Sequence, residues 1–279
     1  MSEPARFDLE DDDTVSDLDE LPLWSAPFGL CLLERVRLSG VSTALDVGFG
    51  TGFPLLELAM RLGPSAAVHG LDPSPAAHRR TRFKLHRFGL GNVSLHRGVA
   101  EAMPFGDAVF DSVVSNNGYN NVSDRDLSFR ETARICRLGA QLVFTMNLEG
   151  SFRELHDELH AVLEAEGLPT AASALRSFIS ARRPPLGDVL RSARAAGFAV
   201  EDVEHRAFDF RFADTAALDG HAFFRRFQLP YLRELVPGDR QAAVFDELWR
   251  RLDAVAKPLG ELRLSVPFVT VSARREGPA

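Results

Sequence analysis

The chain has 279 residues, 45% of them hydrophobic, and carries a formal net charge of −7 at pH 7. This length suffices for one substantial core with a smaller attached unit. No apolar run reaches the length of about 18 residues that a membrane-spanning helix needs, and the N-terminus lacks the pattern of a signal peptide. The two cysteines, Cys31 and Cys136, lie in apolar stretches and predict neither a disulfide framework nor a metal cluster. We therefore expect a cytoplasmic protein that does not bind membranes.

Acidic residues are concentrated in the first 20 positions. Residues 1–20 hold nine acids against Arg6 alone, a net charge of −8, so that residues 21–279 sum to +1. Like charges at this density repel one another and stay hydrated. The pattern predicts a mobile acidic tail.

A helical arm is expected next, over residues 21–38, because its apolar residues recur at helical spacing. Trp24 and Phe28 are its large aromatic residues. They either anchor the arm to the core or contact a substrate, and the sequence leaves both possibilities open.

Residues 44–52 read Ala-Leu-Asp-Val-Gly-Phe-Gly-Thr-Gly, and a helix-forming stretch follows from residue 54 within a helix predicted over residues 51–62. A strand that ends in a glycine turn and leads into a helix N-terminus forms a cradle for a small ligand. Glycines allow the tight bend and the close approach of the ligand. The residues of this cradle with expected ligand contacts are Asp46, Gly48, Phe49, Gly50 and Gly52.

The glycine spacing argues against a dinucleotide. A dinucleotide fingerprint has the pattern G-x-G-x-x-G, and here Phe53 stands where that pattern requires its third glycine. The carboxylate of Asp46 would repel a pyrophosphate, whereas it can pair with an ammonium group. The expected ligand is therefore a nucleoside that carries an amino acid.

The run Leu-Asp-Val-Gly-x-Gly-Thr-Gly resembles the first motif of the class I S-adenosylmethionine-dependent methyltransferases. The resemblance implies an α/β fold with a Rossmann-like, doubly wound, seven-stranded sheet. That sheet is mostly parallel with its last strand antiparallel, and S-adenosylmethionine is the cofactor. The closest likeness is to the ubiquinone/menaquinone-biosynthesis and arsenite methyltransferase-like branch. Arsenic is not an expected substrate, because Cys31 and Cys136 do not match the cysteines of the arsenite enzymes.

Residues 67–72 predict a second strand that ends in Asp72, 20 residues after Gly52. This is the distance at which a ribose-binding carboxylate follows such a glycine loop. The resemblance implies that Asp72 accepts hydrogen bonds from the ribose hydroxyls and that Pro73 borders the cofactor. The alternative is a carboxylate that caps the following helix, which Pro73 and Ser74 begin.

A basic stretch lies in the helix predicted over residues 75–88. Its charged residues are Arg79, Arg80, Arg82, Lys84 and Arg87. Because this stretch lacks the aromatic side chains on which single-stranded nucleic acids stack, it predicts a solvated helix face. No nucleic-acid partner is expected.

Residues 98–105 read Gly-Val-Ala-Glu-Ala-Met-Pro-Phe and resemble the adenine-binding turn of the same family. The resemblance implies adenine contacts from the backbone at Ala100 and from Glu101. Val99 stands where the family commonly has an aspartate, which removes one acceptor for the adenine amino group. The alternative for Glu101 is a helix-start or turn carboxylate.

Residues 110–116 predict a buried parallel strand. Ligands bind outside the carboxyl ends of such strands, where this strand carries Ser115, Asn116 and Tyr119. The resemblance implies that Ser115 and Asn116 lie beside the methionine part of the cofactor. Asn120 and Asn121 are expected to be turn residues.

The second half of the chain predicts helices over 151–167, 170–181 and 186–196, with strands over 198–208 and 262–273. The intervening residues 213–258 are expected to be mostly helical. We assign residues 39–149, 184–212 and 260–279 to the cofactor-binding core. Residues 150–183 and 213–259 are assigned to a helical lid or substrate region.

The implied chemistry is methyl transfer to a small-molecule acceptor by in-line displacement under that lid. A general base is needed only for a weakly acidic acceptor, and no obligatory catalytic residue is evident; His221 and Tyr119 are the candidates. His221 is alternatively a packing residue among phenylalanines. The candidate acceptor contacts are Trp24, Phe28, Tyr119, His221, Phe224 and Arg225.

Residues 156–160 read His-Asp-Glu-Leu-His, which places two histidines four residues apart, as in metal-binding helices. The second position is Asp instead of Glu, and no third ligand is evident, so no metal is expected. Two other functions remain open: a non-catalytic nucleoside-binding or scaffolding protein, and a dinucleotide-dependent oxidoreductase. The acceptor, the methylated atom and the oligomeric state do not follow from the sequence.

Overall fold

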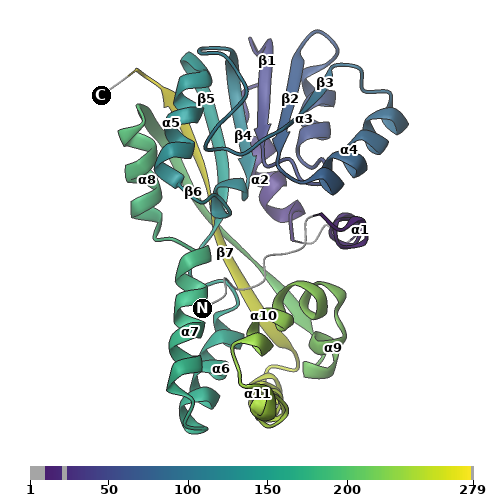
Figure 1. Cartoon of the computed structure of the whole chain (residues 1–279), viewed down its shortest axis with the longest axis vertical. Helices are drawn as coiled ribbons and strands as arrows, with labels where there is room; N and C mark the ends of the chain where they lie inside the picture. Colours follow the sequence, from purple (N-terminus) through teal and green to yellow (C-terminus); the bar gives the residue numbers. More distant parts are fainter. Residues whose placement is uncertain (1–9, 21–23, 278–279) are drawn as a thin grey trace. The chain divides into compact units, whose positions relative to one another are not determined.

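The computed structural model describes residues 10–20 and 24–277 (Figure 1). The chain divides into two compact units. Unit 1 comprises Leu148–Arg183 and Ala207–Pro267, and unit 2 comprises the described residues of Asp8–Asn147, Pro184–Arg206 and Phe268–Ala279. The N-terminal residues 1–9 of the expected acidic tail and residues 21–23 of the expected arm lie outside the described residues.

The described residues form one seven-stranded sheet in the order β3-β2-β1-β4-β5-β7-β6. Strands β1 to β5 pair in parallel with their neighbours, and β7 runs antiparallel to β5. The strands span Thr43–Val47 (β1), Ala67–Asp72 (β2), Val93–Arg97 (β3), Phe110–Asn116 (β4), Cys136–Asn147 (β5), Phe198–Phe212 (β6) and Leu262–Arg275 (β7). This arrangement confirms the predicted mostly parallel sheet of a Rossmann-like fold.

Helices cover the sheet of unit 2. Side chains of α2 and α3 pack with β1, β4 and β5 in one cluster, and α3 packs with β2 and α4 in a second. These clusters provide the apolar burial that holds helices on a buried parallel sheet. The helices of unit 2 are α1 (Asp12–Glu20), α2 (Ala26–Arg35), α3 (Leu55–Leu62), α4 (Pro75–Phe88), α5 (Arg125–Ile135) and α8 (Leu186–Ala195), with the short 3-10 helix η1 (Gly118–Asn120).

Within unit 1, helices surround a core rich in phenylalanine together with residues 207–212 of β6 and 262–267 of β7. Phe152, Phe210, Phe223 and Phe224 are buried there, with ring centroids 5.1–5.9 Å apart for their adjacent pairs. The helical segments are α6 (Arg153–Ala165), α7 (Pro169–Arg182), α9 (Thr215–Gly220), the π-helical turn η2 (Phe224–Gln228), α10 (Leu229–Glu234), η3 (Gly238–Arg240) and α11 (Gln241–Ala256).

The part of the tail that the structure describes is folded. Residues 12–20 form α1, and Asp12 and Asp19 form ion pairs with Arg79, Arg80 and Lys84 of α4. The basic stretch of α4, predicted to be a solvated helix face, is therefore covered only in part. The Arg79 side chain is 53% exposed, whereas those of Arg80 and Lys84 are 29% and 21% exposed. The pairing needs α1 to lie against α4, which local sequence does not reveal.

Residues 137–140 form a bulge within β5. The register shifts there, because Phe110 pairs with Cys136 whereas Ser112 pairs with Gln141. Gly139 takes a φ of +82° at this bulge, a left-handed conformation that glycine adopts without a steric penalty.

Among the described helices, none is both long and apolar enough to cross a lipid bilayer.

Candidate functional site

The loop between β1 and α3 depends on its three glycines. Gly48, Gly50 and Gly52 have φ values of +78°, +53° and +102°, which other residues rarely adopt. A Cβ atom at Gly52 would lie 2.1 Å from Cδ1 of Leu56, so this position is closely packed. A Cβ atom at Gly50 would meet nothing within 4 Å, so the loop has open space beside its centre. A ligand can approach the backbone at that point.

Asp46 lies on β1 one residue before its end and is fully buried. Neither of its carboxylate oxygens has a hydrogen-bond partner among the described residues. Burial, together with the charge of Asp72, raises the pKa of Asp46 to about 8, and the backbone of Leu55 opposes this shift only in part. A buried carboxylate without a partner is costly, so this site favours a cationic or hydrogen-donating ligand group.

Asp72, at the end of β2, connects that strand to the glycine loop. Its Oδ2 atom accepts a hydrogen bond from the amide of Gly50 at 2.9 Å, and its Oδ1 atom accepts one from the amide of Ser74 at 2.8 Å. Burial raises its pKa, and these two amides partly offset that effect. Each carboxylate oxygen retains a further acceptor site. The cap of α4 is Ser74, whose hydroxyl accepts from the amide of Ala77, while Pro73 is exposed beside it.

The turn after β3 is fixed by Glu101. Its Oε1 atom accepts hydrogen bonds from the amides of Ser123 at 2.6 Å and Asp124 at 3.1 Å. The carboxylate therefore holds the residues that begin α5, which agrees with the alternative of a helix-start carboxylate. Its second oxygen takes no part in these two bonds. Ala100 is buried next to it, while Val99 is 45% exposed.

Polar groups at the end of β4 connect it to its neighbours. The hydroxyl of Ser115 donates to the carbonyl oxygen of Val47 at 2.8 Å. The side chain of Asn116 donates through Nδ2 to the carbonyl oxygen of Ser25 at 3.0 Å. Its Oδ1 atom accepts from the hydroxyl of Thr145 at 2.9 Å. These bonds place β4, β1, β5 and the segment before α2 around one edge of the sheet.

Comparison with known proteins agrees with this geometry. Residues 45–144 match the family described as a methyltransferase domain. A demethylmenaquinone methyltransferase of Geobacillus kaustophilus (strain HTA426) is 35% identical over 112 residues, which cover 40% of this chain and 48% of that protein. An arsenite methyltransferase of Aquipseudomonas alcaligenes is 30% identical over 149 residues, 46% of this chain and 43% of that protein. Residues 45–144 therefore form a methyltransferase domain, which confirms the resemblance to the class I S-adenosylmethionine-dependent methyltransferases.

The cofactor of this family member is S-adenosylmethionine. The chain spans less than half the length of the two curated relatives above. Among solved structures, the YcgJ protein of Bacillus subtilis has a TM-score of 0.58 at 16% identity, covering 90% of this chain and 99% of that chain. At that identity the likeness shows the fold alone.

The aromatic candidates near the glycine loop of this methyltransferase domain are buried. Phe49 is 1% exposed, and its ring packs in the cluster of α3, β2 and α4. The side chain is therefore part of the core beneath the glycine loop. Tyr119 is fully buried, stacks on Phe129 at 4.7 Å and hydrogen-bonds to Thr132 through its hydroxyl at 2.7 Å. Its place in the core gives its phenol a structural partner in α5.

Trp24 and Phe28 also lie within unit 2. Phe28 is fully buried between Trp24, at 5.2 Å, and Phe268 of β7, at 4.8 Å, both in edge-to-face geometry. This packing fits the interpretation of Phe28 as an anchor for the arm. Trp24 is only half-buried.

The remaining acceptor candidates lie in unit 1. Phe224 is fully buried and Arg225 is exposed. His221 is half-buried, with the rings of Phe210, Phe212 and Phe224 at 5.4–6.1 Å. Burial lowers its pKa, and its Nδ1 atom has no partner among the described residues. The structure thus divides the candidates, with cofactor residues in unit 2 and these three in unit 1.

Two residues of α4 that the sequence analysis did not select support the glycine loop. Thr81 donates a hydrogen bond to the carbonyl oxygen of Gly50 at 3.0 Å, and Lys84 donates to that of Thr51 at 2.8 Å. They lie three positions apart and therefore share one helix face. Two polar residues three positions apart in the helix that follows Asp72 are the sequence signal from which this contact with the loop could have been predicted.

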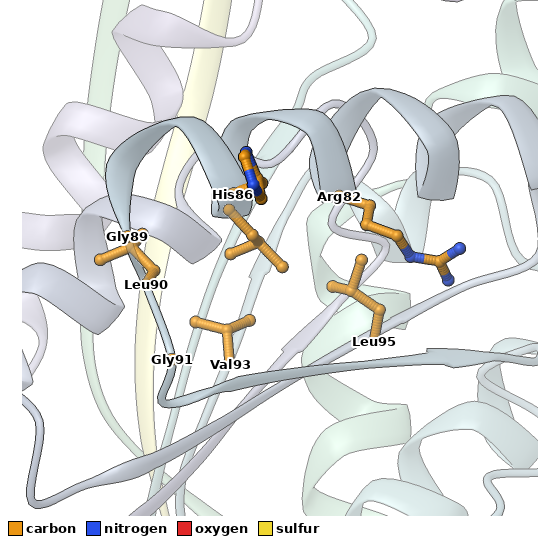
Figure 2. Close-up of a pocket in the computed structure, with 8 residues that line it drawn as sticks. Arg82, His86, Gly89, Leu90, Gly91, Val93 and Leu95 are labelled. Carbon is orange, nitrogen blue, oxygen red and sulfur yellow. The ribbon is translucent and has the colours of Figure 1, made fainter.

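A shallow groove lies between the C-terminal part of α4 and β3 (Figure 2). Its lining includes Arg82, His86, Leu90, Val93 and Leu95. None of the residues predicted for the cofactor or the acceptor contributes to it. The described residues also contain no group of three or more His, Cys, Asp or Glu side chains able to hold a metal ion.

Proposed function

We propose that this chain transfers the methyl group of S-adenosylmethionine to a small-molecule acceptor by in-line displacement. The observation that carries the proposal is the buried, unpartnered carboxylate of Asp46 beneath a glycine loop that Asp72 holds by a hydrogen bond. The relatives named above are methyltransferases by name, and the methyltransferase-domain match over residues 45–144 contains this loop. Their acceptors do not carry over, because the matched family region ends at residue 144.

The chain's residues fit the cofactor by charge and by space. Asp46 would balance the ammonium group of the methionine part, which would remove the cost of its burial. Asp72 would accept hydrogen bonds from the ribose hydroxyls with the acceptor sites that Gly50 and Ser74 leave free. The backbone near Ala100 would meet the adenine edge, and the space beside Gly50 leaves room for the ligand.

The bound cofactor would supply a sulfonium whose methyl carbon is already electrophilic. The task of the chain is therefore to hold the acceptor atom in line and to exclude water, and positioning of this kind can account for much of a rate enhancement. We assign acceptor binding to the helical lid region, residues 150–183 and 213–259. A general base is required only for a weakly acidic acceptor. His221 is the candidate for this role, because an imidazole is a suitable general base near neutral pH.

Thermal unfolding tests the cofactor assignment. S-adenosylhomocysteine should raise the Tm of the chain, by an amount that grows with ligand concentration, whereas NAD should leave it unchanged. Asp72→Ala should weaken S-adenosylhomocysteine binding roughly 10- to 100-fold, the cost of losing charge-assisted hydrogen bonds. Asp107→Asn, at an exposed carboxylate paired with Arg134, is the matched control.

A turnover experiment tests the transfer itself. The chain is incubated with methyl-labelled S-adenosylmethionine and pools of small acids, phenols, amines and thiols, and label in any pool is measured. Stabilisation by NAD, or equal affinity of the parent and Asp72→Ala for S-adenosylhomocysteine, would disprove the cofactor assignment. Cofactor binding without label transfer to any pool would favour the non-catalytic alternative.

A further inference from the structure

Unit 1 contains a buried arginine without a counterion. Arg183 follows the end of α7, is 4% exposed and lies in the interior. Its Nε and Nη1 atoms donate no hydrogen bond to any described residue, and no described carboxylate forms an ion pair with it. Burial lowers the pKa of Arg183 to about 10, with a smaller contribution from Arg182, so the guanidinium remains charged at neutral pH.

A histidine lies beside this charge. His156, on α6, is 3% exposed, and its Nδ1 atom has no hydrogen-bond partner among the described residues. Burial and then the charge of Arg183 lower the pKa of His156 to about 3, so the imidazole is neutral. A neutral imidazole offers one donor and one acceptor. The Arg183 and His156 side chains together therefore present several unused donors and a single positive charge.

The surroundings of these two side chains are aromatic. The guanidinium of Arg183 lies 5.8 Å from the ring centroid of Phe152, and that ring contacts His156 at 6.3 Å, Phe210 at 5.9 Å and Phe224 at 5.1 Å. Phe152 also has a φ of +60°, which is a strained conformation for a bulky residue. Backbone strain of this kind is concentrated at binding sites.

The energetics require an anion. An unpaired charge in an apolar interior is strongly unfavourable, and a ring at 5.8 Å compensates for only part of that cost. A guanidinium matches a carboxylate in planar, bidentate geometry. A phosphate dianion would leave a net negative charge buried beside a neutral imidazole, so a carboxylate monoanion fits better.

We propose that Arg183 and His156 bind the carboxylate of a small organic acid whose apolar body packs against Phe152 and its neighbouring phenylalanines. The inference deepens the proposed function, on which it rests, by naming the acceptor class as an apolar or aromatic carboxylic acid. His221, whose Nδ1 atom also has no partner in the same phenylalanine cluster, would lie within this acceptor site.

Binding of acids without any cofactor tests the inference on the full chain. Benzoate, indole-3-acetate and octanoate are titrated and followed by ligand-detected NMR and calorimetry, with benzamide as the uncharged match for benzoate. At least one acid should bind with a Kd below about 10 mM, and benzamide should bind at least about tenfold more weakly than benzoate. Arg183→Met should abolish acid binding or weaken it at least about tenfold.

Arg182→Met is the matched control. Arg182 is adjacent in sequence but lies over the rings of Phe178, at 4.3 Å, and Tyr231, at 5.1 Å, so its loss should leave acid affinity within about twofold. Arg183→Met should not lower the Tm of the ligand-free chain, because it removes an unpaired charge and keeps the apolar stem.

Three results would overturn the inference: none of the acids binds, Arg183→Met retains acid affinity, or Arg183→Met unfolds as if a buried pair had been broken. A chain that bound S-adenosylhomocysteine but no acid would keep the proposed function and refute only this inference. A chain that bound an acid but no S-adenosylhomocysteine would refute the proposed function instead.

Discussion

At the scale of single residues, the chain keeps two ionisable groups in its interior at a cost in stability. The carboxylate of Asp46 and the guanidinium of Arg183 are both buried and both lack partners among the described residues. Each is best explained by a ligand group of the opposite charge, since an uncompensated buried charge otherwise only destabilises the fold.

The raised pKa of Asp46 predicts a pH dependence of stability. Its ordinary value is 3.8 and its folded value is about 8, so between about pH 4 and pH 8 the folded chain holds a proton that the unfolded chain has released. Stability therefore falls as pH rises through this window, by at most about 1.4 kcal/mol per pH unit for one group. Asp46→Asn should flatten the slope, as measured by urea unfolding from pH 4.5 to 8.5.

Asp72 contributes to the same slope, because burial raises its pKa as well, so some dependence should persist in Asp46→Asn. The matched control is Asp107→Asn, at an exposed side chain, which should keep the parent slope. Equal slopes in the parent chain and in Asp46→Asn would contradict a protonated Asp46. The comparison between the two chains decides, because the buried His156, whose pKa is lowered to about 3, adds a slope of opposite sign below about pH 6.5 to both.

At the scale of elements, β1 and η1 approach each other closely at the site. A Cβ atom at Gly118 would lie 2.5 Å from the carbonyl oxygen of Val47 and 2.4 Å from the hydroxyl of Ser115. The same carbonyl oxygen accepts the hydrogen bond from Ser115. The ends of β1 and β4 therefore meet only because residue 118 has no side chain.

Gly118→Ala should consequently destabilise the chain by roughly 1–3 kcal/mol, as overpacking in a well-packed interior does. It should also weaken S-adenosylhomocysteine binding, because it displaces the end of β1 beside the glycine loop. Gly106→Ala, where the added Cβ would meet only Val109 at 3.8 Å, should change neither quantity. Equal stabilities of the two variants in urea would show that the junction tolerates a side chain.

Helix α1 is held on α4 by charge. The carboxylate of Asp19 is 10% exposed and pairs with both Arg80 and Lys84, and Lys84 in turn donates to the carbonyl oxygen of Thr51 in the glycine loop. Asp12 pairs with Arg79 at a more exposed position. Partly buried pairs contribute more than exposed ones, whose worth is small and screened by salt.

Removing the Asp19 charge should therefore release α1. Asp19→Asn is expected to increase amide hydrogen exchange over residues 12–20 by about tenfold or more, whereas Asp12→Asn should change it by no more than about threefold. Hydrogen exchange with mass spectrometry measures both. Protection that is unchanged in Asp19→Asn would mean that apolar contacts, such as those of the buried Val15, hold α1 in place.

At the scale of the whole molecule, both cysteines report on folding. Cys31 of α2 and Cys136 at the start of β5 are free and buried. Burial raises the pKa of Cys31 and raises that of Cys136 to about 12, so neither forms a reactive thiolate at neutral pH. In the native chain, neither thiol should react with an aromatic disulfide reagent within minutes. In denaturant, both thiols should react.

The order of reaction at low denaturant is a further readout, because the two thiols lie on different elements of unit 2. Thiols that opened only with the global transition would indicate one cooperative unit, whereas earlier reaction of Cys31 would show that α2 opens first. Immediate reaction of either thiol in the native chain would contradict its burial.

Much of the fold follows from local sequence. The helix over 75–88 was predicted at its observed bounds, because Ser74 caps its start, Pro75 occupies its first turn and Gly89 ends it at a φ of +66°. Helix α3 begins at Leu55, later than the predicted residue 51, because the glycine loop continues through Gly52. The family-specific spacing of the loop and of Asp72 identified the cofactor, since few other ligands need that combination.

The sequence by itself thus determined the order of strands and helices, the glycine loop and the carboxylates that follow two strands, because each depends on neighbours within a few positions. Only the tertiary structure decided which side chains are buried without partners and which are satisfied. Tyr119 has a partner in Thr132. Nε and Nη1 of Arg183 and Nδ1 of His156 have none among the described residues, and these two side chains lie in an aromatic interior. Burial and pairing depend on elements far apart in the chain, and no local pattern records them.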